Sequence, residues 1–210
     1  MTAVIRQLAV GQMQNFSYVI GDPATKQAAI IDPGWEAPRL LQECENNGLT
    51  ATMVILTHTH FDHVTALKTL CSLAPLQIYV HAAEISQIPA VAPIHTTQDG
   101  SVIQLGEVQV RCMHTPGHSP GGQCLLIDTA CFTGDSLFVD GCGRVDLPGS
   151  DPAAMWQSLQ RLAALPPDTV MYPGHDYGPT PTSTIGAQLI SNPYLSQTTK
   201  TGFFHARGVQ

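Results

Sequence analysis

The chain has 210 residues, of which 43% are hydrophobic and 12% are charged, a composition that is typical of a compact globular protein. Its formal net charge of −7 argues against a nucleic-acid or anionic-lipid surface, because such surfaces need clusters of Lys and Arg. No stretch resembles a signal peptide or is apolar enough to span a bilayer, and the six cysteines form no Cys-x-x-Cys pair. We therefore expect a cytoplasmic protein with reduced cysteines and no nucleic-acid or membrane partner.

The first part of the chain predicts strands that alternate with helices. Apolar and β-branched runs between turn residues are typical of strands, and Asp22-Pro23 marks the turn between the first two. Gly48 follows a segment of helical spacing and predicts its C-terminal end. In chain order we expect strands at 16–20, 27–31, 53–56 and 77–81, and helices at 38–47, 64–73 and 82–87.

The rest of the chain is richer in strands and contains the clearest helix, at 152–165. Asp151 is a typical N-cap, Pro152 suits the first helical position, and apolar residues repeat on one face. Strands separated by helices at both ends, around an antiparallel-looking centre, predict a layered α/β protein. The strand-forming runs lie at 102–105, 108–113, 123–127, 130–133, 137–139 and 169–172.

The segment Thr57-His58-Thr59-His60-Phe61-Asp62-His63 places four metal-binding side chains directly after a predicted buried strand. Burying an imidazole without a partner costs about 1–3 kcal/mol, whereas imidazole and carboxylate are preferred ligands of zinc and iron. An extended backbone would direct His58 and His60 to the same side, and Asp62 and His63 follow as the chain turns into a helix. The segment therefore predicts a metal site, and its two local directions suit two ions better than one.

Three later segments place glycine next to a possible ligand at the end of a strand, namely 115–122 with His118, 132–135 with Asp135, and 172–175 with His175. Glycine permits the tight turns that bring a backbone close to a metal. In this order, the segments resemble the metallo-β-lactamase superfamily, as do Asn15-Phe16-Ser17-Tyr18 and Asp32-Pro33-Gly34. The resemblance covers nearly the whole chain and implies a single domain over 1–210 with a four-layer αββα sandwich.

The resemblance also implies a set of ligands and a reaction. Two divalent ions, most readily Zn²⁺ but also Fe or Mn, would be held near each other, and Asp62 and Asp135 would be the acidic residues of the catalytic centre. A hydroxide bridging two such ions attacks an acyl carbon and releases a thiolate or an alkoxide. The implied ligands are His58, His60 and His118 for the first ion, Asp62, His63 and His175 for the second, and Asp135 as the bridge.

Within the superfamily the chain resembles the glyoxalase II branch, the hydroxyacylglutathione thioester hydrolases. The similar segments are Gly141-Cys142-Gly143-Arg144, Pro173-Gly174-His175-Asp176-Tyr177 and Asn192-Pro193-Tyr194-Leu195. Two features depart from that branch. Val64-Thr65-Ala66 stands where the branch has a glycine pair, and few residues follow His175 for the helical domain that grips glutathione. The thiol carrier is therefore open between glutathione and a carrier protein.

The chain also resembles other families, in which the same ligand positions serve different reactions. Arg144-Val145-Asp146 also resembles the persulfide dioxygenases, in which a single Fe²⁺ would be held by His58, His118 and Asp135. Asp32-Pro33-Gly34-Trp35 and the 192–207 tail resemble small hydrolases of polyketide clusters, which release acyl groups from acyl carrier protein. Hydrolysis of another ester or of a lactone is a further alternative.

Two side chains beyond the ligand set are candidates for substrate binding. Arg144 is the cation next to the metal motifs, so it either meets a substrate carboxylate or pairs with Asp146. Tyr177 either donates to a substrate carbonyl or packs at the rim of the site. The expected partner is a small-molecule thioester or an acyl carrier protein, and the sequence leaves the oligomeric state open.

Overall fold

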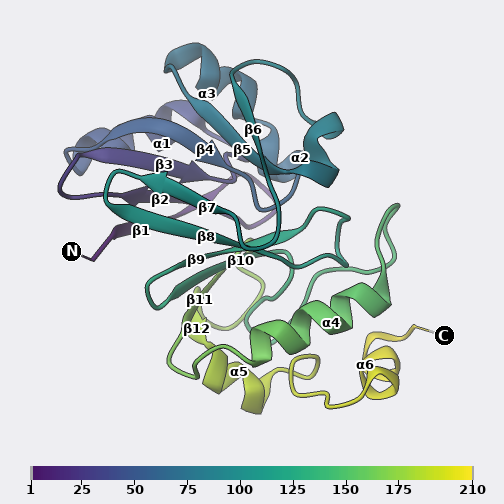
Figure 1. The fold of residues 1–210 in the computed structure, drawn as a ribbon. Helices are drawn as coiled ribbons and strands as arrows, with labels where there is room; N and C mark the ends of the chain where they lie inside the picture. The colour runs from purple at the N-terminus through teal and green to yellow at the C-terminus, as the bar shows by residue number, and fades with distance from the viewer. Residues whose placement is uncertain (1, 210) are drawn as a thin grey trace.

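A computed structural model describes residues 2–209, in which two six-stranded sheets stack face to face and helices cover both outer faces (Figure 1). The first sheet follows the order β1 (Val4–Val10), β2 (Asn15–Gly21), β3 (Gln27–Ile31), β4 (Thr50–Ile55), β5 (Gln77–His81) and β6 (Ile94–Thr97). The second follows the order β12 (Ser183–Thr184), β11 (Val170–Pro173), β10 (Ala130–Gly134), β9 (Gln123–Ile127), β8 (Val108–His114) and β7 (Val102–Leu105).

Each sheet mixes parallel and antiparallel pairs. Strands β1, β2 and β3 run antiparallel, and β3 to β6 run parallel. In the second sheet only the β10–β11 pair is parallel. Helices α1 and α3 lie at the top of Figure 1, and α4, α5 and α6 lie at the bottom. The helices are α1 (Ala37–Asn46), α2 (Phe61–Val64), α3 (Leu67–Leu73), η1 (Ala82–Gln87), α4 (Pro152–Ala163), α5 (Ile185–Ser191) and α6 (Lys200–Arg207).

Three apolar layers hold these four layers of secondary structure together. Alternate side chains of a strand point to opposite faces, so Val19 of β2 packs towards α1 while Tyr18 and Ile20 pack between the sheets. Phe132 of β10 also fills the layer between the sheets, and Leu159 of α4 belongs to the third layer, beneath the second sheet. The expected αββα sandwich is thus confirmed.

Most predicted elements are present, with one break and several additions. The expected helix at 64–73 is wrong as a single helix. The amide of Ala66 donates to the carbonyls of Pro33 and Gly34 at 3.0 and 3.1 Å, which separates α2 from α3. The run at 137–139 joins neither sheet, since Phe138 forms only an isolated bridge with Gly141. Strands β1, β6 and β12 and helices α5 and α6 were not predicted from the sequence.

Backbone hydrogen bonds join the two sheets at one edge, where the predicted ligands lie. Gln123 N–H donates to the Thr57 carbonyl at 2.9 Å, and Phe16 N–H donates to the Gly174 carbonyl at 2.8 Å. Gly174 N–H also donates to the Gly134 carbonyl at 2.9 Å, which aligns the ends of β10 and β11. Separately, no helix within residues 2–209 has both the length and the apolar character to cross a membrane.

Candidate metal centre

The first group of donors consists of His58, His60 and His118. The chain leaves β4 in an extended conformation, so the rings of His58 and His60 lie on the same side, with centroids 4.8 Å apart. His118, from the loop between β8 and β9, comes within 2.8 Å of His60 Nδ1 through its Nε2. Donor atoms of all three lie within 4.8 Å of one another, and the group can hold a metal ion.

The second group consists of Asp62, His63 and His175. Helix α2 provides the first two, and His175 follows β11. Nε2 of His175 lies 3.3 Å from Asp62 Oδ2 and 3.2 Å from His63 Nε2, and all three side chains are buried. Asn15 Nδ2 donates to Asp62 Oδ2 at 2.8 Å and fixes that carboxylate from behind. Donor atoms of this group also lie within 4.8 Å of one another.

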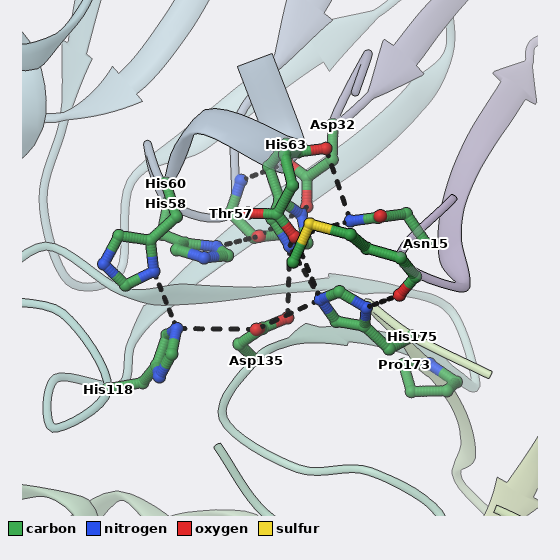
Figure 2. Close-up of polar contacts among 12 residues, drawn as sticks. Asn15, Asp32, Thr57, His58, His60, His63, His118, Asp135, Pro173 and His175 are labelled. Carbon is green, nitrogen blue, oxygen red and sulfur yellow. Dashed lines mark hydrogen bonds and ion pairs between the residues drawn. The ribbon is translucent and has the colours of Figure 1, made fainter. Parts of the chain in front are cut away.

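Asp135 lies between the two groups (Figure 2). Its Oδ2 is 3.4 Å from Nε2 of His118 in the first group and 3.4 Å from Nε2 of His175 in the second, while its Oδ1 is 3.3 Å from Nε2 of His63. Gly134, with φ +47°, makes this approach possible, because a Cβ there would lie 2.4 Å from Thr57 Oγ1. The structure therefore brings all seven predicted donors together at one edge of the sandwich.

The ring orientations of the histidines fit a cation. In four of them Nδ1 contacts an oxygen outside the group, which makes Nδ1 the donor and leaves Nε2, the atom that binds a metal, facing the other donors. The distances from Nδ1 are 3.2 Å for His58 to Thr57 Oγ1, 3.1 Å for His63 to Asp32 Oδ2, 2.9 Å for His118 to the Arg144 carbonyl, and 2.9 Å for His175 to the Met13 carbonyl.

Without a cation, the inward Nε2 atoms face one another and the carboxylates. Burial opposes the charge of His175, but its bonds to Asp135 and Asp62 raise its pKa to about 9, so a proton occupies its Nε2 until a metal ion displaces it. Nε2 of His58 and Oδ1 of Asp135 are buried and have no hydrogen-bond partner among the described residues. Burial holds the pKa of His58 well below its usual range, so its imidazole is neutral and can act as a ligand. Burial opposes the charge of Asp135, but the neighbouring His63 and His175 hold its pKa well below the ordinary value. Neutral imidazoles and ionised carboxylates are the donors that divalent transition metals prefer.

Asp32 supports this site from the end of β3, and the sequence did not predict it as a site residue. Its Oδ2 accepts from His63 Nδ1 at 3.1 Å and from Thr57 Oγ1 at 2.5 Å, while Oδ1 accepts from Thr57 N–H at 2.7 Å. Ser17 Oγ donates to the Asp32 carbonyl at 2.5 Å. The available signal was an Asp-Pro-Gly turn directly after an apolar strand.

Glu84 of η1 connects the two loops that carry the first group of donors. Its carboxylate accepts a hydrogen bond from Thr59 Oγ1, between His58 and His60, and another from Gly121 N–H at 2.8 Å. The side chain is only 3% exposed. Burial raises the pKa of Glu84, yet these bonds outweigh it and lower the pKa below the ordinary value. No pattern in the sequence distinguished this glutamate.

Comparison with known proteins agrees with this architecture. The family model described as "Metallo-beta-lactamase superfamily" matches residues 10–175. The chain belongs to the metallo-beta-lactamase superfamily. The superfamily consists of metal-dependent hydrolases and related enzymes, so the predictions of an enzyme and of divalent-metal binding are supported, while the reaction differs among its members.

Three relatives of this superfamily member are named for different functions or subfamilies. The "Probable polyketide biosynthesis zinc-dependent hydrolase BaeB" of Bacillus velezensis is 33% identical, over 92% of this chain and 87% of the relative. A "Hydroxyacylglutathione hydrolase" of Mesorhizobium japonicum is 35% identical, over 86% of this chain and 82% of the relative. The solved structure of ETHE1 from Myxococcus xanthus superposes with a TM-score of 0.89 at 32% identity, covering 98% of this chain and 90% of that chain.

A pocket of about 400 Å³ opens in front of the donors of this metallo-beta-lactamase superfamily member, and both predicted substrate residues line it. Arg144 bonds twice to Asp146, with both nitrogen–oxygen distances 2.9 Å, so the ion-pair alternative is the arrangement observed. Tyr177 stacks on the ring of His175, with centroids 4.5 Å apart, and its hydroxyl donates to the Met13 carbonyl at 3.3 Å. It is 52% exposed, which agrees with a position at the rim.

Proposed function

We propose that the chain is a hydrolase that cleaves an acyl thioester with two divalent metal ions, most readily Zn²⁺. The observation that supports this most is the division of the donors into two groups of three with Asp135 between them. In this proposal His58, His60 and His118 hold one ion, and Asp62, His63 and His175 hold the other. A mononuclear enzyme would need no second complete group.

When bound, two such ions lower the pKa of a water molecule towards 7 and stabilise negative charge on a carbonyl oxygen. The protein prepares the site for them by fixing each ring: Asp32 holds His63, and the Met13 carbonyl holds His175. Asp62 remains ionised at neutral pH. Although burial opposes its charge, in the metal-free protein a bond from protonated His175, the charge of His63 and a bond from Asn15 lower its pKa to about 2. Oriented ligands raise metal affinity because their geometry is set before binding.

Hydrolysis of a thioester needs neither a protein nucleophile nor an acid for the leaving group. A thiol has a pKa of about 8.5, so a thiolate leaves without a protonating acid. Cys142 lines the pocket, but burial raises the pKa of its thiol to about 12. That thiol is therefore protonated and unsuited to nucleophilic attack, which leaves an activated water as the nucleophile.

A single-iron persulfide dioxygenase is the second candidate. His58, His118 and Asp135 form a set of two histidines and one carboxylate, which suits Fe²⁺ with open positions. The likeness to the ETHE1 structure favours this candidate, since a human relative is named "Persulfide dioxygenase ETHE1, mitochondrial". This reading gives no role to Asp62, His63 and His175 as a second group.

Two assays on one preparation separate the candidates. Protein purified without added metal is analysed for bound ions, then tested for thiol release from acyl thioesters and for oxygen uptake with glutathione persulfide. The proposal predicts about two ions per chain and thiol release without oxygen uptake. One iron per chain with persulfide-dependent oxygen uptake would replace it by the dioxygenase. Comparing acyl glutathione with acylated carrier protein then identifies the thiol carrier.

A further inference from the structure

Exposed apolar side chains gather at the mouth of the metal pocket. Of the large hydrophobic residues that are exposed within residues 2–209, Met13, Phe61 and Tyr177 all line this one pocket, at 40%, 62% and 52% exposure. They come from the β1–β2 turn, the start of α2 and the segment after β11, which are distant in sequence. Exposed apolar patches of this kind mark surfaces that bind an apolar partner or ligand.

The apolar surface continues from the mouth into the pocket. Phe138 and Leu147 line the pocket, and Phe138 is 6% exposed. The ring of Phe138 meets that of Tyr177 edge to face at a centroid distance of 5.3 Å, and Tyr177 stacks on His175. An aromatic wall therefore leads from solvent to the donor His175, and an apolar chain would bury surface along its whole length.

The charges of the pocket do not suit a strongly anionic ligand. Outside the predicted metal donors, Arg144 is the only charged side chain among the described lining residues. Its guanidinium already bonds twice to Asp146. Glutathione carries two carboxylates, and outside the metal donors the lining offers them no unpaired cationic side chain, so burying either of them there would be costly. The lining thus favours an uncharged ligand beside the donors.

We propose that the acyl group cleaved by this enzyme is an uncharged, unsubstituted aliphatic chain that lies against Phe61, Phe138 and Tyr177. This inference rests on the proposed thioester hydrolysis and specifies its substrate class. A hydroxyacyl group such as lactoyl would place a hydroxyl against this apolar wall, where it would lose its hydrogen bonds to water.

The test uses thioesters of N-acetylcysteamine, a neutral thiol, so that only the acyl group varies. Acetyl, propanoyl, butanoyl, hexanoyl and lactoyl thioesters are compared by thiol release. We expect kcat/KM to rise about fourfold for each methylene from acetyl to hexanoyl, the factor that burial of one methylene gives. The lactoyl thioester should fall below the propanoyl thioester, which has the same number of carbons and lacks the hydroxyl.

Matched variants locate the effect. Phe61→Ser and Met13→Ser each alter an exposed side chain of the pocket, and both should reduce the increase in kcat/KM that each methylene gives. Ile190→Ser is the control, because Ile190 is 87% exposed on α5 and does not line the pocket; it should keep the rise. Three results would overturn this inference while leaving thioester hydrolysis intact: a kcat/KM that does not change with chain length, a higher kcat/KM for lactoyl than for propanoyl, or an unchanged increase per methylene in both pocket variants. Absence of thiol release from every thioester would instead contradict the proposed function itself.

Discussion

The carboxylate of Asp32 accepts a hydrogen bond from Nδ1 of His63 at 3.1 Å, across 31 residues of sequence. Asp32 occurs in a left-handed conformation, with φ 47°, directly after β3, and the other bonds of its carboxylate go to Thr57 at the start of the ligand segment. One buried side chain thus fixes both the backbone that precedes the histidines and the ring of one of them. This arrangement makes Nε2 of His63 the atom that faces the other donors.

Asp32→Asn should weaken the metal group of Asp62, His63 and His175. An amide nitrogen facing His63 Nδ1 would favour the other ring tautomer, which places a hydrogen on Nε2 and removes its lone pair from the site. We expect the affinity of one of the two ions to fall about 10- to 100-fold, as for other partners of metal ligands. Chelator competition monitors the two ions separately, and equal affinities in variant and wild type would contradict this role.

Glu84→Ala should destabilise the protein and weaken the group of His58, His60 and His118. It leaves the buried Gly121 N–H without an acceptor, at a cost of about 1–3 kcal/mol in the free energy of unfolding. Glu84→Gln should cost less, since the amide oxygen can still accept from Gly121 and the Thr59 hydroxyl can reverse its bond. Glu45→Gln, at an exposed site of α1, is the control for loss of one charge. Urea unfolding and zinc titration are the measurements, and equal behaviour of all three variants would exclude the connecting role.

Asp135→Ala should remove the contact between the two groups of donors and reduce both metal content and turnover, with the fold retained. Since Asp135 contacts donors directly, the loss should exceed the roughly 10- to 100-fold that a supporting partner contributes. Asp168→Ala, which removes an exposed carboxylate elsewhere, provides the comparison. Full metal content and an unchanged rate in Asp135→Ala would contradict the role of Asp135 as a metal ligand.

The carboxyl of Asp22, which lies away from the metal centre, should make the free energy of unfolding depend on pH in the acid range. Bonds from the Thr25 hydroxyl, Glu107 N–H and Ala24 N–H lower the pKa of its carboxyl to about 2. Because the folded pKa is below the unfolded one, this stabilisation is complete above about pH 5 and is lost as the pH falls towards 2. In urea unfolding of metal-free protein, Asp22→Ala should be less stable than wild type at pH 7, and the gap should narrow by pH 3. If the difference in free energy of unfolding between wild type and Asp22→Ala were the same at pH 7 and pH 3, the ionised carboxylate of Asp22 would not be the stabilising species.

The sequence predicted the parts of the site that local chemistry specifies. His58, His60, Asp62 and His63 were identifiable because four possible ligands within six positions have no ordinary structural role. His118, Asp135 and His175 each needed the pattern of glycine beside a ligand together with the resemblance to a family. The strands of 16–20 and 27–31 were likewise predicted, because turn residues separate two strongly apolar runs.

The parts that were missed depend on contacts between distant segments. Glu84 bonds to Thr59 and Gly121, which are 25 and 37 residues away, and nothing in its own neighbourhood indicates either bond. The break between α2 and α3 arises because the carbonyls of Pro33 and Gly34 approach the amide of Ala66, which no local propensity encodes. For Arg144, the sequence allowed two partners, a substrate carboxylate and Asp146, and only the folded structure shows the bond to Asp146.

The most direct test of two metal ions is anomalous diffraction from crystals grown with Zn²⁺. The account predicts two anomalous peaks at this edge of the sandwich, one among His58, His60 and His118 and the other among Asp62, His63 and His175, with Asp135 in contact with both. A single peak at saturating zinc, or peaks away from these side chains, would contradict it.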